Sequence, residues 1–348
     1  MRTHDELITQ ISKQIQNYRL GELGYPLDEN HVDRWVFQFN KDVREIILLE
    51  TLSLLSHCYF SKGKVKQFLF DVVECEKIWG TDDIFTEIQY IQFLNIQNKG
   101  SSQTHLLEML NDLLEDNYMT GLSTSSTDQT NRYVYLDDCL FSGNTVIRDL
   151  ERWISSAKDH STLDIILLAA HSSGKYYLEK KILPNLCGQK GINYRIWTYK
   201  TFNNSKYDKY YYDCMWPKHT LDDNLSAFIE QLNPSDIDKK FLFRSKEYIS
   251  PLYTGDYSRT IFEQEILKAG AYIHSYCAEP SKSMKPMGYD FFNTLGFGAF
   301  FATYKNISNN SPLAFCWGDP DADDSHPFSK WYPLLPRKGN KNDVITWE

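Results

Sequence analysis

The alternation of short apolar runs with helical patterns between residues 88 and 202 constrains the fold more than any other feature. Four runs have the length and composition of β-strands: IQYIQFLNIQ (88–97), RYVYLDD (132–138), LDIILLAAH (163–171) and INYRIWTYKTF (192–202). The third is almost uninterrupted, which is typical of a strand covered on both faces. Helical patterns separate the runs, so the segment predicts βαβ units and an α/β fold with a Rossmann-like parallel sheet. Right-handed crossovers would gather the loops at the carboxyl ends of the strands on one edge.

Helical and hairpin patterns flank this segment on both sides. Val32, Trp35, Val36 and Phe39 recur at helical spacing near the N-terminus. Towards the C-terminus, residues 297–317 contain two apolar stretches around a pair of asparagines suited to a turn, which predicts a β-hairpin. We expect three parts: an N-terminal helical module over residues 1–80, an α/β core over 86–205, and a C-terminal extension of helices and the hairpin, packed on the core, over 206–348.

Composition excludes several classes of protein. The 348 residues carry a net charge of −9, which argues against broad nucleic-acid binding by the chain itself. The seven cysteines are scattered and none has CxxC spacing, so a disulfide framework or a zinc site is not expected and a reducing cytoplasm is. The charged start MRTHDELITQ does not resemble a signal peptide. No apolar run reaches the roughly 18 residues of a membrane span.

Residues 133–145, YVYLDDCLFSGNT, combine an apolar strand, two carboxylates and a small polar turn that opens a helix. A helix amino terminus has free N–H groups and the positive end of the helix dipole, so it attracts phosphate. Gly143 would let the backbone approach that phosphate closely, and Ser142 and Thr145 would add hydroxyl donors. Asp137 and Asp138 suit sugar hydroxyls or a hydrated Mg²⁺ instead. The plain alternative is that Ser142 caps an ordinary helix.

A strand, two acids, three spacers and Ser/Thr-Gly-x-Thr form the pattern of the type I phosphoribosyltransferases, which DDCLFSGNT (137–145) resembles at each defining position. The resemblance implies the fold of that superfamily and binding of 5-phosphoribosyl-1-pyrophosphate with Mg²⁺. It implies that Asp137 and Asp138 are the catalytic and metal-binding acids, which address the ribose hydroxyls. It places the 5-phosphate on Ser142, Gly143, Asn144 and Thr145.

A second loop fits the same resemblance. In the superfamily, a loop after the first sheet strand grips the pyrophosphate, and NKGSSQ (98–103) stands in that place. Charge, backbone N–H groups and hydroxyls would come from Lys99, Gly100, Ser101 and Ser102. Because Asn-Lys-Gly-Ser is also common turn chemistry, an ordinary turn is the alternative.

The sequence departs from the enzymes of the superfamily at two places. Purine-salvage members often carry an acid near the base where this chain has Phe141, so acid–base help of that kind is absent there. Phe141 would stack on a base or simply pack. The interval 118–131, where a mobile basic loop is usual, is short and has no Lys or Arg. His171, at the end of the third strand, would serve as an acid, a base or a phosphate donor, or only as a hydrogen-bonded core residue.

A narrower resemblance extends over most of the chain. It rests on five segments: HVDRWVFQF (31–39), the Gly-Ser-Ser loop (100–102), LDDCLFSGNT (136–145), MGYDFFNTLGFGAFFATYKNISNNSPLAFCWG (287–318) and KWYPLLPR (330–337). Together they resemble the phosphoribosyltransferase-like proteins of prokaryotic conflict systems, the PRTase-CE type. That resemblance implies an effector of bacterial antiviral defence, with other defence proteins as partners, retron reverse transcriptases in some cases.

Three functional hypotheses follow. The first is a Mg²⁺-dependent transferase or nucleotide hydrolase that acts on phosphoribosyl pyrophosphate or a nucleotide. The second is a module without catalysis that senses a nucleotide and signals to a partner, which Phe141 and the short interval 118–131 favour. The third is an effector directed at nucleic acid, which the net charge of −9 allows only through partners.

Overall fold

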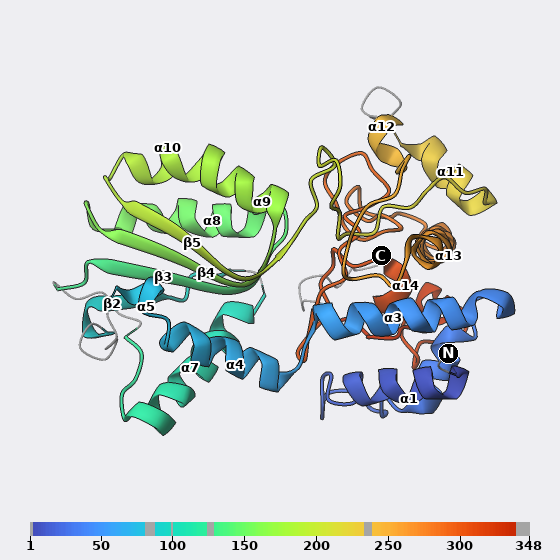
Figure 1. The fold of residues 1–348 in the computed structure, drawn as a ribbon, viewed down its shortest axis with the longest axis horizontal. Helices are drawn as coiled ribbons and strands as arrows, with labels where there is room; N and C mark the ends of the chain where they lie inside the picture. The colour runs from blue at the N-terminus through green and yellow to red at the C-terminus, as the bar shows by residue number, and fades with distance from the viewer. Residues whose placement is uncertain (1–2, 81–87, 99, 124–128, 233–238, 339–348) are drawn as a thin grey trace. The chain divides into compact units, whose positions relative to one another are not determined.

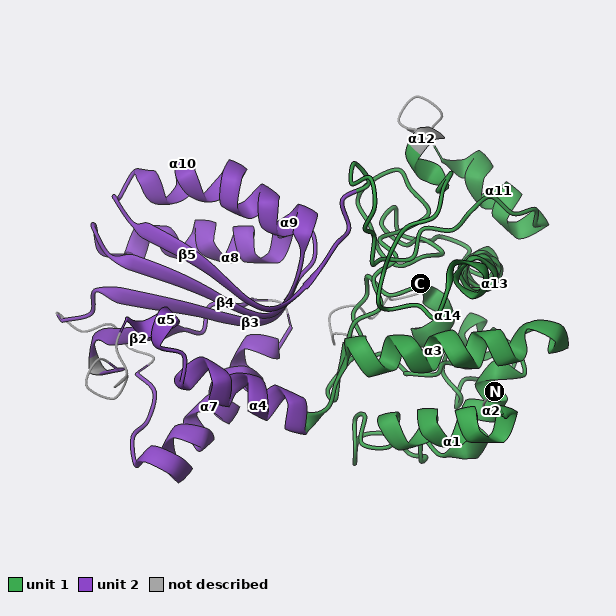
Figure 2. Cartoon of the chain, viewed as in Figure 1, with its two compact units in different colours: residues 1–62, 206–339 green, residues 63–205, 340–348 purple. Residues whose placement is uncertain are grey.

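The computed structural model describes residues 3–80, 88–98, 100–123, 129–232 and 239–338, and the chain divides into two compact units (Figure 2). One unit comprises residues 1–62 and 206–339, and the other comprises 63–205 and 340–348. This division differs from the three ranges expected from the sequence. The N-terminal and C-terminal segments form one unit because the helix Arg44–Cys58 (α3) packs against the helix Asp256–Ser275 (α13).

The second unit is built on a four-stranded parallel sheet, which confirms the predicted Rossmann-like α/β fold. Its strands stand in the order β2-β3-β4-β5 and have the bounds Ile91–Leu94, Arg132–Leu140, Thr162–His171 and Asn193–Phe202. Each strand pairs in parallel with the next, for example Phe93 with Val134 and Tyr135 with Ile165. Parallel pairing places the carboxyl ends of all four strands at one edge, together with the loops that follow them.

Helices cover both faces of this sheet (Figure 1). The helix Asn144–Trp153 (α8) and the helices Ser172–Tyr177 (α9) and Leu183–Gly188 (α10) lie on one face, and Ser102–Tyr118 (α7) lies on the other. A π-helical turn at Leu178–Ile182 joins α9 to α10, and Pro184 stands in the first turn of α10, where its missing N–H costs no hydrogen bond.

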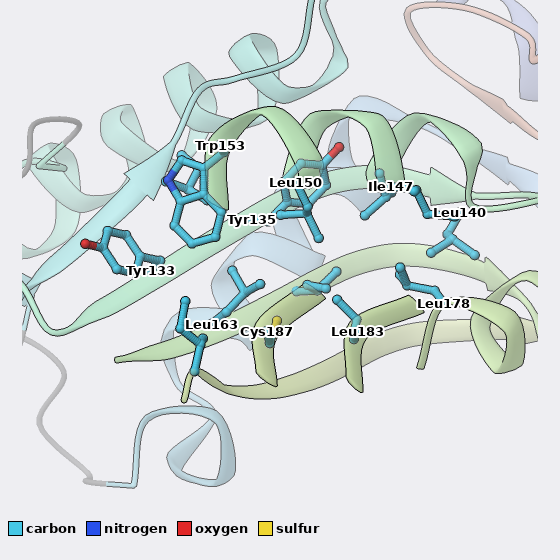
Figure 3. Close-up of a cluster of buried hydrophobic side chains, with 14 of the residues drawn as sticks. Tyr133, Tyr135, Leu140, Ile147, Leu150, Trp153, Leu163, Leu178, Leu183 and Cys187 are labelled. Carbon is cyan, nitrogen blue, oxygen red and sulfur yellow. The ribbon is translucent and has the colours of Figure 1, made fainter. Parts of the chain in front are cut away.

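A buried apolar cluster fills the space between the sheet and the helical segments from α8 to α10 (Figure 3). Alternate residues of β3 face this layer, so Tyr133 and Tyr135 both enter it. The Tyr133 ring meets Trp153 of α8 edge to face, with 4.9 Å between the centroids. Leu150 and Leu163 are completely buried beside them. This layer fixes α8, and therefore the turn that begins it, against the sheet.

Helices make up most of the regular secondary structure of the first unit. Its longer helices are His4–Ile15 (α1), Glu29–Val36 (α2), Arg44–Cys58 (α3), Asp223–Gln231 (α11) and Asp256–Ser275 (α13). Its shorter elements are Lys41–Val43 (η1), Tyr59–Phe60 (β1), Lys239–Leu242 (α12), Ala302–Thr303 (β6), Leu313–Cys316 (α14) and Pro327–Lys330 (η5). The remaining elements, before and beside the sheet, are Lys62–Val73 (α4), Glu76–Trp79 (α5), Ile88–Tyr90 (η2) and Ile154–Ser156 (η3).

The hairpin predicted over residues 297–317 is wrong in its second strand, although Ala302 and Ile307 form an isolated antiparallel bridge within this range. β6 pairs in parallel with β1, and the second apolar stretch is the short helix α14 instead of a strand. A short apolar run that is buried on all sides carries no periodicity, so sequence pattern alone cannot separate strand from helix there. Burial of α14 is completed by Trp35 and Trp331, whose indole N–H groups both donate to the Ala314 carbonyl oxygen over 2.9 Å.

Among the described residues, none of the helices combines the length and the apolar character required to span a membrane.

Candidate functional site

The turn that follows β3 is the centre of the candidate site. The strand does not end at the two acids, as expected, but continues in register with β4 as far as Leu140. Only Phe141, Ser142 and Gly143 then separate it from α8. Gly143 has φ of +90°, in the left-handed region that glycine adopts without strain, and this conformation allows the abrupt change from strand to helix.

The amino terminus of α8 has no side-chain cap. Gly143 occupies the capping position, so Ser142 does not act as the N-cap of the plain alternative. The first hydrogen bond of the helix runs from Ile147 N to Gly143 O over 2.9 Å. Asn144 and Thr145 are exposed at this end. The N–H groups of the first turn and the hydroxyl of Thr145 therefore form a surface on which an anion can be bound.

The first turn of α9 holds this loop in place. Gly174 approaches Phe141 so closely that an added Cβ would lie 1.8 Å from the Phe141 carbonyl oxygen. The start of α9 is itself fixed by the loop after β5, because Ser173 N donates to Asn204 Oδ1 over 2.9 Å and Asn204 N donates to Ser172 Oγ over 3.1 Å. Sequence reasoning missed Gly174 and Asn204. Their signal is small and polar residues directly after two consecutive strands.

The two neighbouring acids have different surroundings. Asp137 is 3% exposed and accepts three hydrogen bonds: from Ser102 Oγ over 2.7 Å, from Asp138 N over 2.9 Å and from the Tyr135 hydroxyl over 3.3 Å. Burial raises the pKa of the Asp137 carboxyl. Asp138 is partly exposed. Its partial burial and the adjacent Asp137 raise its pKa to about 8.

The loop between β2 and α7 meets the same edge. Gly100, with φ of +93°, and Ser101 are exposed, whereas the Ser102 hydroxyl is turned onto Asp137. Lys99 lies outside the described residues. The loop is shaped by Gln103, which is fully buried and accepts from Ile96 N over 2.6 Å and from Gln97 N over 3.1 Å. Sequence reasoning missed Gln103, although a glutamine directly after a Gly-Ser-Ser turn is a signal of loop bracing.

His171 lies beneath the turn and is 2% exposed. Its ring stacks on Phe141 with 4.9 Å between centroids and packs against Phe202, and Nδ1 lies 3.3 Å from Leu140 O. Burial lowers its pKa to about 4, so the ring is neutral at physiological pH. The structure thus brings Phe141 and His171 together, and their rings pack against each other.

The acid pair offers few ligands for a metal ion. Across the part of the chain that the structure describes, no group of three or more His, Cys, Asp or Glu side chains is placed to hold an ion. Mg²⁺ commonly takes only one or two carboxylates from a protein and completes its shell with water and substrate phosphates. Asp138, the more exposed acid, fits that arrangement, whereas Asp137 has its oxygens engaged within the chain.

Comparison with known proteins places the chain in a family. The family model PRTase-CE matches residues 32–337, which include the strands of the sheet, the turn after β3 and the apolar segments around α14. No curated protein matches the chain.

Proposed function

Because the chain belongs to the PRTase-CE family, a phosphoribosyltransferase-like family, we propose that it binds phosphoribosyl pyrophosphate or a nucleotide at the carboxyl edge of its sheet. One observation carries the proposal: α8 begins at left-handed Gly143 without a side-chain cap, directly after a strand of a parallel sheet. Its free N–H groups suit the 5-phosphate of such a ligand. The residues in contact with this phosphate would be Ser142, Gly143, Asn144 and Thr145.

The remainder of the ligand would lie towards the acids and the first loop. Asp138 would accept hydrogen bonds from the ribose hydroxyls. The pyrophosphate would meet the loop 99–102, where Gly100 and Ser101 are exposed. Mg²⁺, held at Asp138 and by the ligand, would neutralise pyrophosphate charge beside the acid pair.

Isothermal titration calorimetry with phosphoribosyl pyrophosphate tests the proposal. The wild type is expected to bind in the presence of Mg²⁺ and more weakly with EDTA. Asp138→Asn is expected to weaken binding about tenfold, since an amide cannot supply the carboxylate that Mg²⁺ would draw from Asp138. Asp159→Asn is the matched control, because Asp159 is an exposed aspartate elsewhere in the same unit, and it should bind like the wild type. Absence of heat from the wild type would refute the proposal.

A second candidate function, sensing without catalysis, is favoured by the packing of Phe141. Its ring is stacked on a buried neutral histidine, so neither residue presents an acid or base to a ligand. Under this candidate the ligand binds and the signal passes to a partner protein. Incubation with phosphoribosyl pyrophosphate and a panel of nucleobases decides between the two: pyrophosphate release supports transfer, and tight binding without release supports sensing.

The biological role that we propose is that of an effector in bacterial antiviral defence. Support comes from the resemblance of five segments to conflict-system proteins. Phage challenge of bacteria that express the chain with its neighbouring genes tests it. Plaque formation should fall with the wild type and recover with Asp138→Asn. Equal protection by the wild type and Asp138→Asn would show that the defence role does not depend on the proposed ligand site.

A further inference from the structure

A continuous chain of hydrogen bonds runs beneath the acid pair and joins three elements of the second unit. Ser102, at the start of α7, contacts Asp137 of β3. The Tyr135 hydroxyl lies 3.3 Å from Asp137 Oδ2 and 2.9 Å from Asp149 Oδ2 on α8, and so bridges the two carboxyl groups. Asp149 also pairs with Arg152 one turn later. Tyr135, Asp137 and Asp149 are at most 3% exposed.

The orientation of β3 separates the duties of the two acids. Neighbouring residues of a strand point to opposite faces, and β3 continues as regular strand past both acids. Asp137 shares a face with Tyr135, on the side that α8 covers. Asp138 points to the other face and is partly exposed. Two carboxylates in this arrangement do not both meet the same ligand from one side.

The contacts of Asp137 are those of a residue that holds neighbouring segments in place. One oxygen, Oδ1, accepts from Ser102 Oγ and from Asp138 N, and the other faces the Tyr135 hydroxyl. These partners take three of the roughly four acceptor positions of a carboxylate. A buried carboxylate with so many donors is held in one rotamer, and it holds its donors in return.

We propose that Asp137 is a positioning residue, held by Tyr135 and Asp149, which fixes Ser102 and the loop before it beside the turn that opens α8. Asp138 is then the acid that meets the ligand. This inference rests on the proposed function and assigns a role to each member of the acid pair. Its consequence is that the Tyr135 hydroxyl, although Tyr135 is fully buried, governs binding of the pyrophosphate part of the ligand through Ser102.

The test compares two ligands, phosphoribosyl pyrophosphate and ribose 5-phosphate, by calorimetry. Ribose 5-phosphate needs only the turn at 142–145 and Asp138, whereas phosphoribosyl pyrophosphate also needs the loop that Ser102 ends. Tyr135→Phe removes the bridging hydroxyl and keeps the ring. We expect it to weaken phosphoribosyl pyrophosphate about tenfold, the scale of one hydrogen bond, and to leave ribose 5-phosphate unchanged.

Tyr133→Phe is the matched control, because Tyr133 is a buried tyrosine of the same strand and face whose hydroxyl accepts from Lys158 N, away from the acids. It should bind both ligands like the wild type. Ser102→Ala cuts the chain of hydrogen bonds at its other, partly exposed end and keeps the test valid if Tyr135→Phe does not fold. It should show the same selective loss.

The possible results separate this inference from the function on which it rests. Wild-type binding of phosphoribosyl pyrophosphate that neither Tyr135→Phe nor Ser102→Ala weakens would overturn the positioning role alone. Equal loss of both ligands in Tyr135→Phe would also overturn it, since Asp137 would then support the ribose itself. A wild type that binds neither ligand would overturn the proposed function, and this inference with it.

Discussion

Gly174 lies against the carbonyl oxygen of Phe141, at a distance that leaves no room for a side chain: a Cβ would stand 1.8 Å from that oxygen. The contact joins the first turn of α9 to the turn that opens α8. The helix after β4 thus determines where the loop after β3 lies. A surface at which phosphate can bind is positioned by backbone packing, with its side chains left free to meet a ligand.

Gly174→Ala is expected to destabilise the protein by about 3 kcal/mol, the upper range for overpacking a rigid site. The Cβ meets backbone that cannot rotate away, so the turn at 141–143 must move and affinity for ribose 5-phosphate must fall. Urea unfolding and calorimetry measure the two effects. Gly188→Ala is the control, because nothing lies within 4 Å of its added Cβ, and it should cost nothing. Equal stability of both variants would contradict the packing described.

Gly143→Ala tests the backbone conformation of the turn, whereas Gly174→Ala tests the room for a side chain. An added Cβ meets its nearest neighbours at an ordinary 3.7 Å, so the penalty comes from φ of +90° alone. We expect a loss of about 1–2 kcal/mol in the free energy of unfolding. Gly143→Asn should recover part of this loss, because asparagine tolerates left-handed conformations better than alanine. Unchanged stability in Gly143→Ala would show that the turn adopts another conformation.

His171 makes the stability of the protein depend on pH. Its pKa falls from 6.5 to about 4 on folding, so the folded protein binds fewer protons than the unfolded chain between these values. The contribution is fully present above pH 6.5 and is lost as the pH falls towards 4, by roughly 3 kcal/mol in all. His171→Phe keeps the packing and cannot titrate. Its unfolding free energy in urea should decline less over this window, and parallel pH profiles would disprove the assignment.

Asp164 stabilises the opposite edge of the sheet. It is fully buried near the start of β4 and accepts from Arg132 Nε over 2.7 Å, from Arg195 Nε over 2.8 Å and from Trp197 Nε1 over 2.8 Å. Asp164→Ala leaves Arg132 and Arg195 without their shared anion and should cost about 3 kcal/mol in urea unfolding. Affinity for phosphoribosyl pyrophosphate, measured well below the unfolding temperature, should persist.

Asp159→Ala is the matched control for that prediction. Asp159 lies 3.6 Å from Lys190, but its side chain is 69% exposed, so the pair contributes less than about 1 kcal/mol. A similar loss of stability in Asp164→Ala and Asp159→Ala would mean that burial does not determine how much Asp164 contributes to the free energy of unfolding. A loss of ligand binding in Asp164→Ala at low temperature would show that the two edges of the sheet are coupled.

The sheet could be predicted because its strands are local, apolar and separated by clear helical patterns. The turn after β3 could be predicted because glycine and small polar residues between a strand pattern and a helix pattern indicate a tight turn. The continuation of β3 beyond Asp138 to Leu140 could not, because it depends on pairing with β4, up to Leu140 opposite Ala170. With regular strand on both sides of the acids, their side chains point to opposite faces of the sheet, and their burial therefore differs.

Long-range packing explains the other differences. Sequence pattern gives no sign that Tyr59 pairs with Ala302, nor that α3 and α13 pack together, because nothing local marks either contact. Gly174 and Gln103 support the candidate site from adjoining elements, and their roles depend on neighbours that are remote in sequence. His171 was weighed both as a functional group and as a core residue. Its burial between Phe141 and Phe202 appears only once the strands are assembled.

The most direct test of the proposed ligand site is a crystal structure of the protein with phosphoribosyl pyrophosphate and Mg²⁺. We expect the 5-phosphate on the backbone N–H groups at the start of α8, the ribose beside Asp138, and the Ser102 hydroxyl still on Asp137. Density for the phosphate at any other surface, or a fully occupied ligand whose ribose is held by Asp137, would contradict it.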